Sequence, residues 1–330
     1  MGLIDKVCCV FPGQGSQFVG MGKDLYSKNK EIVEKIFHTG NEILGYDITN
    51  LIINNPEETL INNPEETLKK TIYCQSGILL INLAFLEVLN KIKEILCSLT
   101  LGHSVGEYAA LVASKALSLE DALKLVKTRA ELMSKCIPNE KVEEDTSHMA
   151  AVLTENHGLV YNTCKIYSSP GNTVELAIEN SESQKVISGN NNAVIKAVKH
   201  LRSKGIKVIY LPVEGPFHSE LMRPAAEEMK KTLENKIKEP TIQYIANSTG
   251  KVIYKPKEIE ESSVKQIYQT VKWKQSLETA IKMATEKKIK TFIECGPGDV
   301  QTKLLKRNPL YKDITVLNVK DYINQNHLLN

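Results

Sequence analysis

The 330-residue sequence lacks the segments that mark membrane, secreted and nucleotide-binding proteins. Its longest apolar run, 78–89, is interrupted by Asn82 and Glu87, so it fits a core helix better than a bilayer span. The first residues do not have the pattern of a signal peptide. The sequence contains neither a G-x-G-x-x-G fingerprint nor a Gly-Lys-Ser phosphate loop. We therefore expect a soluble protein with no membrane partner and no dinucleotide or phosphate-loop site.

The sequence also contains few arginines and no cysteine pair with C-x-x-C spacing. The odd number of cysteines and the absence of a C-x-x-C pair argue against a metal site and favour free thiols in a reducing compartment. The net charge of +3 gives no indication of nucleic-acid binding. Because guanidinium and ammonium groups are not interchangeable at a carboxylate site, each of the few arginines needs an explanation. The cysteines are Cys8, Cys9, Cys74, Cys97, Cys136, Cys164 and Cys295, and the arginines are Arg129, Arg202, Arg223 and Arg307.

The hydrophobic fraction of 42% and the charged fraction of 25% are those of a globular protein, long enough for a large domain with a smaller one. Alternating strand and helix patterns predict a mostly parallel sheet covered on both faces, with strands at 7–11, 95–101, 242–246 and 291–295. A βαββαβ pattern, the order of the ferredoxin-like unit, interrupts this domain, with strands at 149–153, 174–179, 185–188 and 206–213 and helices at 155–165 and 193–204. Further helices are predicted at 220–238, 262–268 and 276–287.

Two local patterns concern the helical parts of the large domain. Ser118-x-x-Asp121 resembles a capping box and predicts the start of a helix that ends near Cys136, before Pro138. The heptapeptide NNPEETL occurs twice, at 54–60 and 62–68. We interpret it as a local duplication in a surface connection, because lengthening a loop costs little free energy.

The most informative segment is Gly-His-Ser-Val-Gly at 102–106. It follows an apolar stretch and precedes a helical one, which is the strand–turn–helix context of a nucleophile elbow. The glycines permit a sharp turn that exposes the Ser104 hydroxyl. The N–H of Val105 can then face the oxygen that becomes negative when Ser104 attacks a carbonyl. We expect an acyl-handling serine enzyme; the alternative is a glycine turn without chemistry.

Arg129 lies on an apolar helix face, because it follows one-face spacing with Ala122, Val126 and Met133. Burying an unpaired cation is costly, so the pattern requires an anionic partner. Two partners stay open at this point. One is an Asp or Glu elsewhere in the fold, and the other is a substrate carboxylate held by the planar guanidinium fork.

His218 and Gln14 are candidates for the general base and for a second oxyanion donor. His218 lies between a strand-like run and a helix, where α/β sheets place their sites. We prefer it to His103 as the base for Ser104, since we expect the elbow turn to direct the neighbours of Ser104 elsewhere. Gln14 lies in a glycine-flanked turn after a strand and can donate its backbone N–H, although a plain βα turn would look the same.

Five motifs, in this order, resemble the malonyl-CoA:acyl-carrier-protein transacylases of fatty acid synthesis: PGQGSQ at 12–17, GHSVGE at 102–107, Arg129, GPFHS at 215–219 and ECGPG at 294–298. The resemblance covers nearly the whole chain. It implies an α/β-hydrolase-like large domain at 1–138 and 209–330, with a ferredoxin-like domain inserted at 139–208. It also implies ping-pong transfer of malonyl from malonyl-CoA to acyl carrier protein, with no cofactor and no metal, since the coenzyme A thioester is a substrate.

The same resemblance implies roles for single residues. Ser104 would be the acylated nucleophile, His218 its base and Arg129 the ligand of the malonyl carboxylate. Three main-chain groups would complete the machinery: oxyanion-hole N–H groups at Gln14 and Val105, and a histidine-orienting carbonyl at Gln266. The acyl site would be lined by Gln75, Asn180 and Phe217. The glycine-rich stretch that the family usually has before the first strand of the small domain is replaced here by residues 145–148. This difference concerns the conformation of a loop and not the chemistry.

The implied partner is a small acidic acyl carrier protein with a phosphopantetheine arm, and the chain is expected to be a monomer. Arg202, Lys204 and Lys207 are candidates for docking this carrier, because no acidic residue occurs between 202 and 210. The alternative is an ordinary solvated charge cluster. The Lys, Asn and Ile bias favours an apicomplexan plastid enzyme, the other compartment being bacterial cytoplasm.

Two other functions are open on sequence alone. A serine esterase or thioesterase with the same elbow would normally need an acidic third member before the histidine and has no use for Arg129. A non-catalytic carrier-binding module would tolerate the loss of Ser104 or His218, and both are present.

Overall fold

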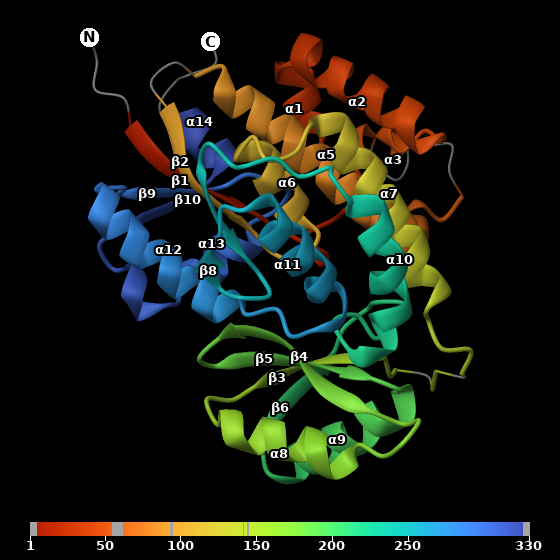
Figure 1. The fold of residues 1–330 in the computed structure, drawn as a ribbon. Helices are drawn as coiled ribbons and strands as arrows, with labels where there is room; N and C mark the ends of the chain where they lie inside the picture. Colours follow the sequence, from red (N-terminus) through yellow and green to blue (C-terminus); the bar gives the residue numbers. More distant parts are fainter. Residues whose placement is uncertain (1–4, 55–61, 93–94, 141, 144, 326–330) are drawn as a thin grey trace.

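The computed structural model describes residues 5–54, 62–92, 95–140, 142–143 and 145–325, which form two sheets with their helices (Figure 1). The larger sheet, sheet A, has the strand order β10-β9-β1-β2-β7-β8 and is parallel except for its edge strand β8. Residues 7–11 of the inner strand β1 are fully buried, because neighbours pair with it on both sides and helices cover both faces. Its strands are β1 (Asp5–Phe11), β2 (Ile95–Gly102), β7 (Gln243–Ala246), β8 (Lys251–Val252), β9 (Thr291–Glu294) and β10 (Thr315–Asn318).

Sheet B is a separate antiparallel sheet with the order β4-β5-β3-β6. Its two helices, α8 (His157–Tyr167) and α9 (Asn191–Ser203), lie on its outer face, away from the large domain (Figure 1). They enclose a second, smaller hydrophobic core. The predicted mixed α/β fold with a βαββαβ ferredoxin-like insertion is confirmed. The strands of sheet B are β3 (Met149–Leu153), β4 (Val174–Ser181), β5 (Gln184–Gly189) and β6 (Lys207–Tyr210).

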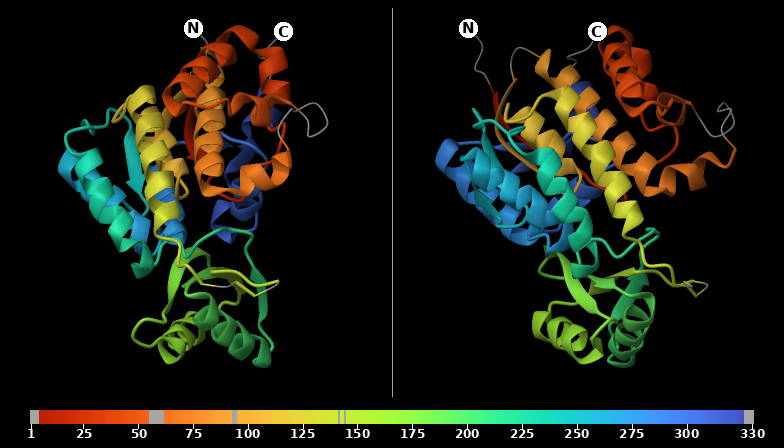
Figure 2. Two further views of the ribbon diagram at one scale, coloured as in Figure 1. Left: turned by 90° about the vertical axis from the view of Figure 1, so that its right-hand side faces the viewer. Right: turned by 45° about the vertical axis from the view of Figure 1, so that its right-hand side comes forward.

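The helices of the large domain pack around sheet A, and both ends of the described chain lie at the end of the molecule opposite the small domain (Figure 2). α5 is long and apolar enough to cross a membrane, but 83% of its apolar window is buried inside the protein, as predicted for a core helix. The helices of this domain are α1 (Lys23–Lys28), α2 (Lys30–Leu44), α3 (Thr49–Ile53), α4 (Pro64–Lys69), α5 (Thr71–Asn90), α6 (Gly106–Ala113), α7 (Leu119–Lys135), α10 (Arg223–Leu233), α11 (Pro256–Tyr268), α12 (Trp273–Lys287), α13 (Val300–Lys306) and α14 (Val319–Gln325).

Several predicted boundaries differ from the structure. The helix predicted at 220–238 is a 3-10 turn followed by α10, which ends at Leu233. α11 begins at Pro256, six residues before the predicted start, because its first turns are charged and carry no apolar periodicity. The border predicted at 208/209 falls inside β6, all of whose residues pair with β3. The first NNPEETL copy lies mostly outside the described residues, whereas the second forms α4.

Candidate active site

The elbow between β2 and α6 holds Ser104 in a left-handed conformation, with φ of 51°. Close packing explains the flanking glycines: a Cβ on Gly102 would lie 2.0 Å from the Gly106 carbonyl oxygen, and one on Gly106 would lie 2.4 Å from that of Phe11. Such a backbone costs about 1–3 kcal/mol and persists only where the surroundings hold it. Side chains from two distant segments, the turn after β7 and helix α11, do so. The Ser104 N–H donates to Asn247 Oδ1 at 2.8 Å, and its carbonyl accepts from Gln266 Nε2 at 2.8 Å.

Ser104 and His218 are in direct contact, although one precedes and the other follows the inserted small domain in the sequence. Ser104 Oγ is 2.9 Å from His218 Nε2, and His218 Nδ1 is 2.6 Å from the main-chain oxygen of Gln266. A carbonyl can only accept, so Nδ1 carries the proton and Nε2 is free to accept the serine hydroxyl. Burial, with the neighbouring Arg129 charge, lowers the pKa of His218 to about 3. The imidazole is therefore neutral at physiological pH, as a general base must be.

Arg129 is fully buried on α7 and faces the nucleophile. Its Nη2 donates to Ser104 Oγ at 3.3 Å and to Gln266 Oε1 at 2.9 Å, while Nη1 donates to Gln75 Oε1. No Asp or Glu of the described chain forms an ion pair with it, and its buried Nε has no partner there. Burial lowers the pKa of Arg129 from its usual value. The sequence left two anionic partners open for Arg129. The described residues supply no Asp or Glu in direct contact with it, which leaves a substrate carboxylate.

The turn after β1 packs tightly against the elbow. A Cβ on Gly13 would lie 2.3 Å from the His103 carbonyl oxygen, and the His103 N–H donates to the Phe11 carbonyl at 2.8 Å. This close approach brings Gln14 to the wall of the cavity in front of Ser104. Within the described chain, the backbone N–H groups of Gln14 and Val105 donate to no protein acceptor. Both are available to a substrate oxygen.

The cavity in front of Ser104 has a volume of about 60 Å³ and is lined by both domains. The expectation for His103 was wrong: its side chain lines the same cavity, with Nε2 2.9 Å from Asn180 Oδ1 and its ring edge-on to Trp273. Asn180 lies on β4, so this contact links the small domain to the elbow. The lining residues are Gln14, Gln75, His103, Ser104, Met133, Met149, Ile178, Leu211, Val213, Phe217 and His218.

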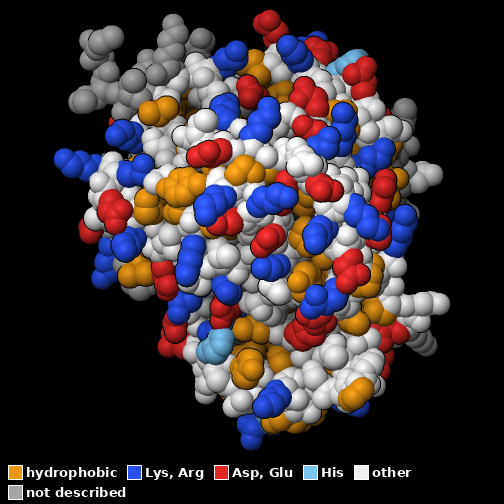
Figure 3. Space-filling view, in the orientation of Figure 1, with side chains coloured by type: hydrophobic (Ala, Val, Ile, Leu, Met, Phe, Trp, Pro, Cys, Tyr) orange, Lys and Arg blue, Asp and Glu red, His pale blue; other side chains and the backbone are white. Residues whose placement is uncertain are grey.

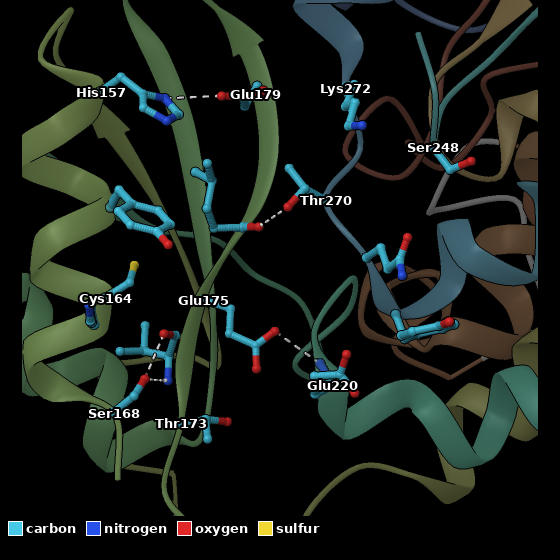
Figure 4. A pocket seen from close by; sticks show the side chains of 16 residues that line it. His157, Cys164, Ser168, Thr173, Glu175, Glu179, Glu220, Ser248, Thr270 and Lys272 are labelled. Atoms are coloured by element: carbon cyan, nitrogen blue, oxygen red, sulfur yellow. Dashed lines mark hydrogen bonds and ion pairs between the residues drawn. The ribbon is translucent and has the colours of Figure 1, made fainter. Parts of the chain in front are cut away.

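A larger hollow of about 690 Å³ lies elsewhere, between α8 and β4 of the small domain and the segment 268–272 (Figure 4). Several of its polar side chains are already paired: His157 Nδ1 lies 3.0 Å from Glu179 Oε1, and Glu175 accepts the Glu220 N–H. It contains no serine–histidine pair. The smaller cavity is therefore the candidate active site. In the described part of the chain, no group of three or more His, Cys, Asp and Glu could hold a metal ion.

The candidate docking residues are exposed but do not share one face of sheet B. Side chains alternate along β6, and Val208 packs into the small core, so Lys207 and Ile209 lie on the opposite face. Leu211, next on that face, lines the cavity. Arg202 lies over the Tyr210 ring, and Tyr210 packs against the small core. Lysine, arginine and acidic side chains are intermixed over the face drawn in Figure 3.

Two buried residues of the site were missed by sequence reasoning. Glu107 lies in the first turn of the otherwise apolar α6 and is fully buried, and a buried carboxylate always needs donors. That pattern was the available signal. Asn247 follows β7 and lies outside the five motifs, so only the fold reveals its contact with Ser104.

Comparisons with known proteins assign the family. The acyl transferase domain family matches residues 8–321. The malonyl CoA-acyl carrier protein transacylase of Bacillus subtilis is 37% identical over 318 residues, which cover 95% of this chain and 94% of that protein. The chain belongs to the malonyl-CoA:acyl-carrier-protein transacylase family. The resemblance seen in the five motifs is thereby confirmed.

Other transacylases agree along the whole chain. The Haemophilus influenzae protein is 35% identical over 319 residues, covering 96% of each chain. The solved transacylase of Coxiella burnetii has a TM-score of 0.84 and 29% identity, covering 100% of this chain and 99% of that one. A malonyl-transacylase solved in complex with its type II PKS acyl-carrier protein has a TM-score of 0.85 and 31% identity, covering 98% and 99%.

Proposed function

We propose that Ser104 carries the malonyl group between coenzyme A and acyl carrier protein, with His218 moving its proton. The chain is an acyltransferase of fatty acid synthesis that transfers malonyl from malonyl-CoA to the carrier. The observation that carries the residue roles is the convergence of His218 Nε2 and Arg129 Nη2 on one oxygen, Ser104 Oγ. One group accepts the hydroxyl proton, and the other offers a positive charge to the incoming acyl group.

In the first half-reaction, His218 Nε2 takes the Ser104 proton as Oγ attacks the thioester carbonyl. The negative oxygen of the tetrahedral intermediate accepts from the N–H groups of Gln14 and Val105. The carbon–sulfur bond then breaks, and His218 returns its proton to the coenzyme A thiolate. The second half-reaction reverses these steps with the carrier's phosphopantetheine thiol as nucleophile, so the protons balance and no cofactor is needed.

Arg129 gives the site its preference for an acyl group with a free carboxylate. Its charge is buried without a direct anionic partner, and a substrate carboxylate would supply one. The Gln75 carboxamide, which lies on Nη1, would share this recognition. The Phe217 ring, on the wall of the cavity, would restrict substituents next to the thioester carbonyl.

The geometry favours transfer over hydrolysis. His218 is oriented by a main-chain carbonyl, whereas an esterase of this type normally uses a carboxylate there. The small, largely apolar cavity leaves little room to place a water against the acyl-enzyme. A non-catalytic carrier-binding module is disfavoured because the nucleophile and the base are in hydrogen-bond contact.

The carrier is the natural partner for the rim of β6. Lys207, Ile209 and Leu211 lie on one face of the chain at and after β6. Leu211 lines the cavity, whereas Ile209 and Lys207 are exposed to solvent. Four residues of strand span about 13 Å, within reach of a long prosthetic arm. We assign docking of the acidic carrier to Lys207 and Lys204, with Arg202 holding the strand end through the Val208 carbonyl.

The seven free cysteines support a reducing compartment, plastid or bacterial cytoplasm, and we expect a monomer.

Mass measurement of the intact protein after mixing with malonyl-CoA tests the nucleophile. One malonyl group should be added, and peptide mapping should place it on the peptide that contains Ser104. The Ser104→Ala variant should stay unlabelled, while Ser114→Ala, which changes a buried serine at the C-terminal end of α6, should label normally. Labelling of Ser104→Ala to the wild-type extent would refute the assignment.

A further inference from the structure

A fully buried carboxylate lies behind Arg129, separated from it by one side-chain amide. Glu107 Oε1 accepts from the Asn247 N–H at 2.8 Å and from the Tyr244 hydroxyl, and Oε2 accepts from Gln266 Nε2 at 2.7 Å. Among the described residues, no Lys, Arg or His forms an ion pair with it. The carboxylate and the guanidinium are therefore buried close together without touching.

The Gln266 amide has a fixed orientation between these two charges. Its Oε1 accepts from Arg129 Nη2 at 2.9 Å, and its Nε2 donates to Glu107 Oε2 at 2.7 Å. Reversing the amide would point its NH₂ group at the guanidinium and its oxygen at the carboxylate, so both charges favour the observed orientation. Nε2 also donates to the Ser104 carbonyl, and the main chain of Gln266 orients His218.

A direct contact between the two charges would work against the proposed substrate. Carboxylates bind guanidinium groups in paired, charge-assisted hydrogen bonds, which are among the strongest in proteins. If Glu107 touched Arg129, a malonyl carboxylate would have to displace it. If Glu107 were absent, the buried cation would have no counter-charge in the empty site.

We propose that Gln266 is a spacer that makes the enzyme selective for acyl groups with a free carboxylate. It lets Glu107 stabilise the Arg129 charge while the guanidinium keeps hydrogen-bond donors free for malonyl. Gln266 and Glu107 are thus positioning residues that act through Arg129. The inference rests on the proposed role of Arg129 as the ligand of the substrate carboxylate.

Moving the carboxylate by one position tests the spacer. The double variant Glu107→Gln/Gln266→Glu keeps the net charge and a donor–acceptor pair between 107 and 266, but it places the carboxylate directly on Arg129. It also replaces the amide donor to the Ser104 carbonyl by an oxygen, which should slow both substrates alike, so the ratio between substrates is the readout. It should be more thermally stable than either single variant. Its kcat/KM for malonyl-CoA should fall at least about tenfold relative to its kcat/KM for acetyl-CoA, with the loss mainly in KM.

A second variant covers the case in which the double variant does not fold. Gln266→Met has a similar volume and keeps the main-chain carbonyl, but it removes the amide, so Arg129 can move onto Glu107. It should shift the malonyl-to-acetyl ratio in the same direction. A wild-type ratio in either folded variant, or equal losses for both substrates, would overturn the spacer.

Arg129→Ala separates this inference from the proposed function. If that variant loses malonyl and acetyl transfer equally, the proposed role of Arg129 fails and the spacer falls with it. If Arg129→Ala selectively loses malonyl transfer but the Gln266 variants keep the wild-type ratio, only the spacer is wrong.

Discussion

At the scale of single residues, the site depends on polar groups that are almost completely shielded from bulk solvent. Ser104, Arg129, His218 and Gln266 are all nearly or completely buried, and each has specific partners. Burial shifts the charge states in a useful direction. The lowered pKa of His218 keeps its imidazole neutral, so in the proposed mechanism it can accept the serine proton without first losing a proton to solvent.

Arg129→Ala should lower kcat/KM for malonyl-CoA by about tenfold to a hundredfold or more, because a charged hydrogen-bonded contact in a closed site contributes roughly 1.5–3 kcal/mol. Transfer from acetyl-CoA, which has no carboxylate to bind, should fall much less. Arg129→Lys should also lose much of the malonyl rate, since an ammonium cannot form the planar fork. Steady-state kinetics with both thioesters measure these effects. Equal losses for the two substrates would mean that the arginine is only structural.

Sequence reasoning reached the residues whose chemistry has a local pattern. A serine between glycines, an arginine on an apolar helix face and a histidine at a strand end each have a recognisable neighbourhood. The contacts of Asn247 and the Gln266 side chain have none, because they join segments more than a hundred residues apart. The orientation of His103 was mistaken for a related reason. Its partners Asn180 and Trp273 come from a strand of the small domain and a distant helix.

At the scale of elements, α7 sets the position of Arg129. Its start was predictable from Ser118-x-x-Asp121, and the Ser118 hydroxyl does accept the Asp121 N–H at 3.0 Å. Elements without such signals were missed: β8 has only two residues, and β10 lacks the run of three consecutive buried residues that the equally short β7 and β9 contain. The sheet order was not predictable at all, since no local pattern specifies which parallel strands become neighbours.

Ser118→Ala should destabilise the protein by about 1 kcal/mol by removing the N-cap of α7, which for a chain of this size lowers the melting temperature by about 2 °C. Asn156→Ala is a matched change, because Asn156 Oδ1 caps α8 of the small domain by accepting the Leu159 N–H at 2.9 Å. Neither change should alter the malonyl-to-acetyl ratio at 25 °C, since both caps lie away from the cavity. Calorimetry and kinetics check this. A changed ratio in Ser118→Ala alone would show that Arg129 is sensitive to the helix end.

At the scale of the whole molecule, residues of both domains form the candidate active site. Met149 and Ile178 of sheet B line the same cavity as Ser104. The backbone of Val271 also joins β4 to the large domain, because it donates to Ala177 and accepts from Glu179. The small domain therefore forms one wall of the site. We expect a carrier that delivers its arm between the domains to contact this wall, of which β6 is an edge strand.

Reversing the charges of Lys204 and Lys207, at and next to the edge strand β6, should weaken binding of the carrier and leave the KM for malonyl-CoA nearly unchanged. Lys204→Glu/Lys207→Glu should raise KM for acyl carrier protein several-fold at low salt, because rim charges act mainly on association. The difference from wild type should shrink as salt rises and screens those charges. Lys30→Glu/Lys35→Glu makes the same change in net charge on exposed lysines of α2, at the opposite end of the molecule (Figure 1), and should have little effect. If both double variants raise KM equally, the effect is one of net charge, and if neither does, the carrier docks on another face of the cleft.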